Sequence, residues 1–332
     1  MRQSLIDDHS TNRIASVYLA FAEREAHGRS ALYEALARGV AADPVALAFL
    51  AELPRAQQQP NLLFAAVKYL YGTPGDWGNF RRLLLEHGDE IRATMMAQST
   101  QTNEPARCAT LLPLLARLRP PLALLEVGAA AGLCLLPDAY AYDYDGHRVP
   151  PTLFTSAPPP TFFCCVHRAP LPDRGLEIIW RAGLDLRPID ITDPEQIAWL
   201  EALVWPDEGN RLQLVRAALK VAHQYPLQVI QGDLRTDLRA LVARMPVEAT
   251  RVVFHTAVLG YLSSADERSA FGQTVKDLNV VWISNEPPAL SPYMTQGLSK
   301  PWPLGLFLLS MNRRPVAWTD PHGASLDWIA DS

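Results

Sequence analysis

Long hydrophobic runs are missing from this 332-residue sequence. The most apolar stretch, residues 111–127, is interrupted by Arg117, Arg119 and prolines. Because a membrane helix needs about 20 consecutive apolar residues, we expect no transmembrane segment. The first residues, "MRQSLIDDHS", carry two acids where a signal peptide is apolar. These features favour a cytoplasmic protein.

Cysteine and positive charge are also scarce. The spacing of Cys108, Cys134, Cys164 and Cys165 matches neither a disulfide framework nor a zinc site. We therefore expect reduced thiols; no ligand spacing demands a metal, and a metal held by Asp185, Asp190 and His255 stays an open alternative. The formal net charge is −5, whereas a nucleic-acid partner requires a basic surface. We expect a small-molecule partner and neither nucleic acid nor membrane, while the oligomeric state stays open.

Helical periodicity governs the first third of the chain. From residue 12 to about 118 apolar residues recur at helical spacing, as in the stripe Ile14, Val17, Tyr18 and Phe21. A further helix start is marked by Asp43-Pro44, where an acid precedes a first-turn proline. The pattern predicts an N-terminal helical cap domain over residues 1–118.

Short aliphatic strands alternate with helices after residue 120. The predicted strands are 122–127, 177–182, 227–231, 251–256 and 279–284, and the predicted helices are 194–204, 208–223, 234–244 and 264–277. Helix starts are expected at Asp193 and Ser263. This alternation is typical of a doubly wound, mostly parallel α/β sheet.

Two further features complete the predicted sheet domain, residues 119–332. Two extended runs joined by "NRRP" predict an antiparallel C-terminal hairpin. A proline-rich insertion is expected at about 147–176, where only "TFFCCVH" looks strand-like.

A glycine turn follows the first predicted strand. The strand stops at Glu126, and Gly128 and Gly132 lead into a predicted helix whose backbone amides would face the carboxyl edge of the sheet, where α/β folds bind ligands. Dinucleotide enzymes favour an apolar residue before such a turn, whereas class I S-adenosylmethionine enzymes typically have an acid there. Glu126 favours S-adenosylmethionine, with Ala129 and Leu133 as further cofactor contacts.

Acids at later strand ends extend this hypothesis. Asp185 is the preferred acceptor for the ribose hydroxyls, and Asp233 with Leu234 would contact the adenine. Asp143 is the alternative ribose acid, because it lies closer to Glu126 in sequence. It would, however, leave a very short helix for the crossover.

His255 ends the fourth predicted strand, which faces the transferred methyl group in this kind of fold. A neutral imidazole could take a proton from the attacking group. The alternative is a core histidine bonded to a backbone carbonyl.

Six strings resemble, in order, the blocks of the bacterial domain-of-unknown-function family 2332: "QTNEPARCATLLPLL", "LLEVGAAAGLCLLPDAYAYDY", "RAGLDLRPIDITDP", "LVWPDEGNRLQLVRAAL", "FHTAVLGYL" and "DPHG". The resemblance covers nearly the whole chain and implies a class I methyltransferase-like fold without an assigned reaction. The family usually has Ser at Ala130 and Asn at Cys134. The resemblance singles out these residues: Gln101, Asn103, Glu104, Arg107, Glu126, Gly128, Gly132, Asp185, Pro188, Asp190, Trp205, Asp207, Arg211, His255 and His322.

Several of these residues are candidates for the substrate site or a lid. Gln101, Asn103 and Glu104 either cap the next helix, with Asn103 as the cap, or fold over the cofactor. Arg211 either clamps an acidic substrate or pairs with an acid one turn earlier, Asp207. The remaining candidates are Asp190, in the third string, and His322, for which a turn-supporting role is favoured.

The sequence predicts an S-adenosylmethionine-dependent methyltransferase that acts on an unidentified small acceptor. The first alternative is a degenerate fold that binds a ligand without turnover, as Ala130 and Cys134 suggest. A nicotinamide-linked oxidoreductase is a weaker alternative, because Glu126 counts against it.

Overall fold

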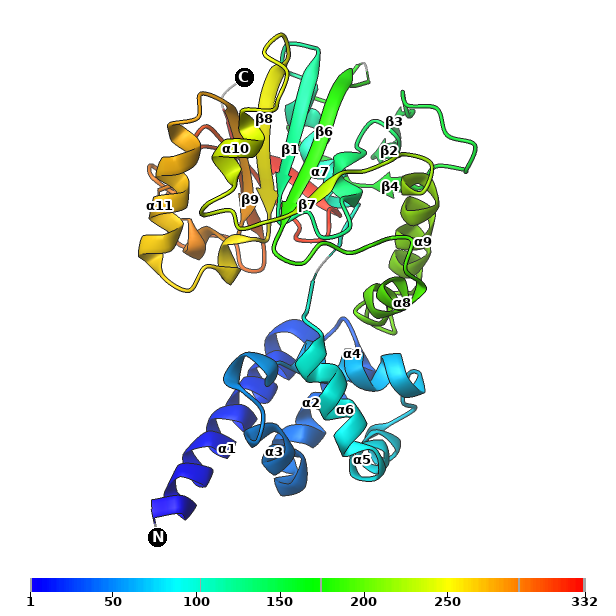
Figure 1. Ribbon diagram of the computed structural model, residues 1–332, viewed down its shortest axis with the longest axis vertical. Coiled ribbons are helices and arrows are strands. Elements are labelled where there is room, and N and C mark those ends of the chain that lie inside the picture. The colour runs from blue at the N-terminus through cyan, green and yellow to red at the C-terminus, as the bar shows by residue number, and fades with distance from the viewer. Residues whose placement is uncertain (1, 102, 174, 292, 331–332) are drawn as a thin grey trace. The chain divides into compact units, whose positions relative to one another are not determined.

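The computed structural model describes residues 2–101, 103–173, 175–291 and 293–330 (Figure 1). The chain forms two compact units. The helical unit contains residues 1–102 and 193–213, and the sheet unit contains residues 103–192 and 214–332. The division therefore differs from a boundary at residue 118, because residues 103–118 belong to the sheet unit. Among the described residues, no helix is long and apolar enough to cross a membrane.

The helical unit packs short helices around an aromatic core. Its helices are α1 (Arg2–Phe21), α2 (Ala31–Ala42), α3 (Pro44–Ala51), α4 (Pro60–Tyr71), α5 (Trp77–Glu86), α6 (Gly88–Ala97), α8 (Pro194–Ala202) and the first residues of α9 (Gly209–Ala222). The predicted caps are confirmed: Asp43 accepts from Val45 N and Ala46 N, and Asp193 accepts from Glu195 N. The predicted stripe in α1 is only partly buried, because Val17 is exposed.

A nine-stranded sheet with the order β5-β12-β11-β10-β9-β8-β1-β6-β7 forms the second unit. Its parallel strands are β1 (Leu122–Val127), β6 (Ile178–Asp185), β7 (Val229–Gln231), β8 (Thr250–Thr256) and β9 (Val281–Glu286). Next come the antiparallel β10 (Phe307–Met311), β11 (Arg314–Thr319) and β12 (Ser325–Trp328), and β5 (Cys165–His167) runs parallel to β12. A mixed α/β fold with a mostly parallel sheet and an antiparallel C-terminal hairpin is thus confirmed.

Helices cover both faces of this sheet (Figure 1). On one face α10 (Leu238–Val242) and α11 (Ala265–Lys276) bury their apolar side chains against Leu125, Val127 and Val253. The other face is covered by α7 (Arg107–Leu115), whose residues are all buried. Since side chains alternate along a strand, Glu126 lies on the α7 face of β1.

The connection after β1 differs from the prediction. No α-helix follows Gly132; the chain makes one 3-10 turn, η3 (Leu133–Leu135). It then enters a separate three-stranded sheet, formed by β2 (Ala141–Tyr144), β3 (His147–Val149) and β4 (Thr161–Phe163) in the order β3-β2-β4. Two tyrosines of this small sheet, Tyr142 and Tyr144, are buried, and the Tyr144 hydroxyl donates to Ala109 O of α7 at 2.8 Å.

Two local predictions were also wrong in detail. The run "TFFCCVH" is not one strand: it breaks at Cys164, whose N–H donates to Asp143 O, so β4 and β5 pair in different sheets. Helix α11 is capped by Ser264, which accepts from Glu267 N, instead of Ser263. The Ser263 hydroxyl donates to the Glu267 carboxylate.

Candidate functional site

The carboxyl ends of six strands meet at one edge of the large sheet. Strands β1, β6, β7, β8 and β9 are parallel, and β11 has the same direction because two antiparallel pairings separate it from β9. Open α/β sheets bind ligands outside this edge. The residues that follow these strand ends are therefore the candidate site.

The glycine turn is pressed against β6. Gly128, Ala130 and Gly132 all have positive φ, of 73°, 48° and 73°. A Cβ atom on Gly128 would lie 2.3 Å from Val258 Cγ2, so only glycine fits. Gly128 N donates to Leu184 O at 2.7 Å, and this bond holds the turn in place.

Two amides of this turn already have partners within the protein. Ala130 N donates to Asp185 Oδ2, and Ala131 N donates to Asn103 Oδ1, each at 2.8 Å. The expectation of helix amides facing a ligand is therefore not met. Ala129 and Leu133, predicted as cofactor contacts, are buried. Ligand contacts at this turn would have to come from side chains.

The structure places one of the two ribose-acid candidates beside β1. Asp185 ends β6, the strand next to β1, and it also accepts from Arg187 N at 2.8 Å. Asp143 lies in β2 of the small sheet, where it accepts from Gly146 N at 2.7 Å. Only Asp185 is at the carboxyl edge.

The predicted adenine contacts follow β7, the last strand on that side. Asp233 accepts from Arg235 N at 2.8 Å and from its guanidinium. These bonds lower the pKa of Asp233, the hydrogen bond from the Arg235 side chain most of all. Leu234 packs against the apolar core of the sheet unit. Asp233 is thus engaged with a neighbour at this edge.

Glu126 is the most unusual group of the site. Its side chain is 4% exposed, and Oε2 has no hydrogen-bond partner. Burial raises the pKa of this carboxyl well above its ordinary value, Cys134 and Asp185 raise it further, and the Arg107 guanidinium opposes them. An ionised carboxylate in this position is costly unless a cation joins it.

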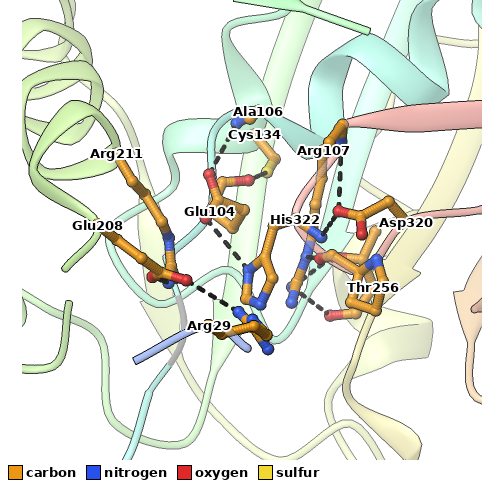
Figure 2. Close-up of polar contacts among 12 residues, drawn as sticks. Arg29, Glu104, Ala106, Arg107, Cys134, Glu208, Arg211, Thr256, Asp320 and His322 are labelled. Carbon is orange, nitrogen blue, oxygen red and sulfur yellow. Dashed lines mark hydrogen bonds and ion pairs between the residues drawn. The ribbon is translucent and has the colours of Figure 1, made fainter. Parts of the chain in front are cut away.

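Arg107 connects α7 to the strand ends, as Figure 2 shows. Its guanidinium donates to Thr256 Oγ1 at 3.0 Å and to Pro321 O at 2.8 Å. Gly323 makes this contact close, because a Cβ atom there would lie 2.1 Å from Ala106 O. The "DPHG" and "NEPAR" strings therefore form one structural feature.

A second contact of this feature joins Glu104 and His322 (Figure 2). Glu104 Oε2 lies 3.4 Å from His322 Nδ1, and Glu104 Oε1 accepts from Ala106 N at 3.2 Å. The His322 backbone N–H donates to Asp320, which forms the predicted turn. His322 thus extends from that turn toward Glu104.

Cys134 lies beneath the glycine turn. Its thiol donates to Glu104 O at 3.3 Å. A hydrogen bond with Cys108, followed by burial, raises the pKa of the Cys134 thiol, so the thiol stays protonated. Cys134 is therefore packed beneath the glycine turn as a neutral group.

Asn103 does not cap α7. The residue before that helix is Ala106, and no side chain caps it. Instead, Asn103 Oδ1 accepts from the glycine turn, and Asn103 Nδ2 is buried without a partner. Asn103 thus contacts the glycine turn itself, and the expectation that the string folds over a cofactor stays a prediction. Gln101 belongs to the helical unit, and Thr102 lies outside the described residues.

His255 is a buried core residue near the carboxyl end of β8. Trp282 Nε1 donates to His255 Nε2 at 3.0 Å, so Nδ1 carries the proton that it shares with Glu286 Oε1 at 2.7 Å. The ring is fully buried, and Glu286 also accepts from Val258 N. Both ring nitrogens are engaged, as in the alternative of a core histidine, but with side chains in place of a backbone carbonyl; the role of His255 as a base stays a prediction.

Arg211 and the "WPD" string belong to the helical unit. Arg211 donates to Glu208 at 2.6 Å, where one of the two alternatives expected Asp207, and Glu208 also accepts from Arg29 (Figure 2). Trp205 lies in the helical core and donates to Asn61 Oδ1 at 3.0 Å. These contacts stabilise the helical unit, so the string has a structural role there.

A cavity of about 520 Å³ opens beside the glycine turn and is lined by residues 131, 188–192, 222–227 and 229. Of the predicted site residues only Asp190 lines it, and the Asp190 carboxylate accepts from Thr192 N. No motif in the sequence indicated this cavity, because it arises where the segment after β6 meets the end of α9.

Sequence reasoning missed three polar residues at the strand ends: Thr256, Asn285 and Glu286. All three are buried. A signal was present, because "FHT" and "ISNE" each place polar residues at the end of an apolar strand. Among the described residues, no group of three or more His, Cys, Asp or Glu side chains is arranged to hold a metal ion.

Comparisons with known proteins identify the family and leave the chemistry open. No curated protein matches the chain. A crystal structure described as that of a possible exported protein from Bordetella parapertussis is 13% identical, covers 87% of this chain and 74% of its own, and has a TM-score of 0.28. The model of a family described as uncharacterized proteins conserved in bacteria, DUF2332, matches residues 15–328. The motifs gathered at the sheet edge thus lie within that match, and the chain belongs to this family.

Proposed function

We propose that the chain is an S-adenosylmethionine-dependent methyltransferase whose site lies at the carboxyl edge beside Glu126. The observation that carries this proposal is the buried Glu126 carboxyl, whose Oε2 has no hydrogen-bond partner among the residues that the structure describes. A ligand ammonium group is the cation that would complete it, because a charged hydrogen bond offsets the cost of burying a carboxylate.

The other polar groups nearby fit the same ligand. Asn103 Nδ2 is a buried donor without an acceptor, whereas Glu126 Oε2 is a buried acceptor without a donor. An amino acid group carries both complements, a carboxylate and an ammonium. Asp185, at the end of the neighbouring strand, stands where ribose hydroxyls would be bound. When bound, S-adenosylmethionine supplies an electrophilic methyl group.

In this proposal, the contribution of the protein is alignment and exclusion of water. Glu126 and Asn103 fix the amino acid end, and the Cys134 and Arg107 contacts hold the surrounding segments in place. Precise positioning accounts for much of the rate in displacement reactions. Because both ring nitrogens of His255 are engaged, we do not assign a proton-transfer step to it.

Isothermal titration of the full chain with S-adenosylhomocysteine, the demethylated product, tests the proposal. We expect the native chain to bind S-adenosylhomocysteine. The affinity of Glu126→Gln should be at least about tenfold lower, because a neutral amide cannot form an ion pair with the ammonium. Glu248→Gln is the matched control, since Glu248 is exposed, and it should bind normally. Absence of heat and of a thermal shift with the native chain would end the proposal.

A second candidate is a ligand-binding protein without turnover, and the engaged His255 favours it. The same titration separates the two, when it is followed by assay of methyl transfer to a pooled set of small acceptors. Binding with transfer supports the methyltransferase. Binding without transfer, together with an adenosine-containing molecule that copurifies with the chain, supports the alternative.

A further inference from the structure

The Arg107 guanidinium is buried without a direct anionic partner. The side chain is 4% exposed, and its hydrogen bonds go to Thr256 Oγ1, Thr256 O and Pro321 O, which are all neutral oxygens. Within the part of the chain that the structure describes, no carboxylate forms an ion pair with it. Because guanidinium stays charged at any physiological pH and a buried charge is costly unless paired, this group lacks an anion.

Asn285 supplies a second donor beside it. This side chain is fully buried in β9, and Thr319 Oγ1 donates to Asn285 Oδ1 at 2.7 Å. This bond uses the amide oxygen of Asn285 and leaves its NH₂ group. Among the described residues, Asn285 Nδ2 has no hydrogen-bond partner. An unpaired amide N–H is unfavourable in the protein interior, so this donor also calls for an acceptor.

Register places these two donors on the same face of the sheet. Thr256 and Asn285 are paired residues of the parallel strands β8 and β9, and paired residues of neighbouring strands project to the same side. Since Thr256 Oγ1 bonds to Arg107, Asn285 also lies on the α7 side. The Phe307 ring, 6.0 Å from Arg107 Cζ, adds an apolar wall.

Local charge selects the kind of anion. Glu104, Glu126 and Asp320 lie in the same unit near Arg107, and Figure 2 shows Glu104 and Asp320 around it. One guanidinium among several acids can balance a single negative charge but not the two charges of a phosphate monoester. A planar carboxylate also matches the paired N–H groups of a guanidinium.

We infer that Arg107 and Asn285 form a carboxylate-binding subsite at the ends of β8 and β9, and that the methyl acceptor is a small carboxylic acid. The assignment of this carboxylate to an acceptor rests on the proposed methyltransferase function. The subsite lies at the end of β8, whereas Glu126, Asn103 and Asp185 lie at the ends of β1 and β6 or beside them. Two ligands would thus meet at neighbouring strand ends.

The test titrates the full chain with sodium benzoate and with benzamide, its neutral isostere, in the presence and absence of S-adenosylhomocysteine. We expect benzoate to bind at least about tenfold more tightly than benzamide, as a charge-assisted pair requires. Arg107→Met and Asn285→Asp should each reduce benzoate affinity by about tenfold or more, the second because it replaces a donor with an acceptor. Equal affinity for the two probes in the native chain would overturn the inference.

A matched control and a second readout keep the outcomes distinct. Arg181 is also partly buried, but it is paired through two bonds of 2.8 Å with Asp138, so Arg181→Met should leave benzoate affinity unchanged. If Arg107→Met fails to fold, the amide NH₂ resonances of Asn285 report the same contact by shifting with benzoate and not with benzamide. If the chain binds benzoate but not S-adenosylhomocysteine, the proposed function is wrong and the subsite stands. If it binds S-adenosylhomocysteine but not benzoate, the subsite is wrong and the proposed function stands.

Discussion

At the scale of single residues, this protein keeps several polar groups buried at a cost to stability. Glu126 Oε2, Asn103 Nδ2 and Asn285 Nδ2 all lack partners. Natural proteins leave few buried polar atoms unsatisfied, and each one needs an explanation. Their concentration at one sheet edge is the reason to assign that edge a ligand.

Glu126 should make the stability of the protein depend on pH. Burial raises its folded-state pKa, so above the unfolded-state value the folded protein still holds a proton that the unfolded chain has lost. The contribution of Glu126 to the free energy of unfolding is therefore most favourable at low pH. It decreases as pH rises from the unfolded-state pKa to the folded-state pKa. Glu126→Gln should raise the Tm relative to the native chain at neutral pH.

The Tm difference should shrink at about pH 4, where the unfolded carboxyl is largely protonated as well. Thermal unfolding of both chains across this range measures it. A native chain that gains stability over Glu126→Gln as pH rises would contradict the assignment, because the carboxylate would then be stabilised in the folded state.

His255 offers a different residue-scale prediction. His255→Ala removes the ring between Trp282 and Glu286 and leaves buried groups unpaired, so we expect the free energy of unfolding to fall by about 3 kcal/mol. Chemical denaturation measures this loss. S-adenosylhomocysteine affinity should stay the same in the folded variant, and a selective loss of affinity would show that the ring reaches the ligand after all.

At the scale of elements, periodicity predicted the strands and helices whose formation depends on interactions within one element. The strands at 122–127 and 251–256 and the capped helices after Asp43 and Asp193 are set by apolar patterns and caps that act within one element. The helix predicted after Gly132 is absent: the chain makes the 3-10 turn η3 there and continues into the small sheet. Short strands such as β2, β3 and β4 carry too little pattern to be distinguished from loops.

The contact between the "DPHG" turn and the start of α7 can be tested with glycine. Gly323 has a φ of 86°, and a Cβ atom would lie 2.1 Å from Ala106 O. Gly323→Ala should therefore separate the turn from Arg107 and lower the Tm. Gly297 has nearly the same φ, 87°, but no atom within 4 Å, so Gly297→Ala measures the backbone strain alone, about 1–2 kcal/mol.

The clash predicts a clear difference between the two glycine variants. Thermal unfolding should show a larger loss for Gly323→Ala than for Gly297→Ala. Equal losses would mean that the turn moves away without consequence, and the contact would then have no role in supporting the site.

At the scale of the whole molecule, each compact unit is assembled from segments far apart in sequence. The helical unit takes residues 193–213 from between β6 and β7. Trp199 and Trp205 from this segment are buried in its core. A contiguous fragment that ended at residue 118 would lack both rings.

Trp205→Ala should therefore destabilise the helical unit, although Trp205 comes from the sheet half of the sequence. The ring lies 5.5 Å from that of Phe21 and 5.4 Å from that of Tyr33. Removing a buried aromatic side chain costs about 3–5 kcal/mol. Helical circular dichroism during chemical denaturation measures the change, and a loss below about 1 kcal/mol would argue against this core.

The sequence by itself determined the mixed α/β class, the helical first third, the principal strands and the family, since each depends on local periodicity or on contiguous motifs. It also singled out Glu126, Asn103, Asp185 and the "DPHG" string as candidates for a site. Only the tertiary structure decided that His255 belongs to the core, that Asp143 lies in another sheet, and that Arg107 and Asn285 are buried at neighbouring strand ends. The physical reason is that burial and hydrogen-bond satisfaction depend on residues distant in sequence, which no local pattern records.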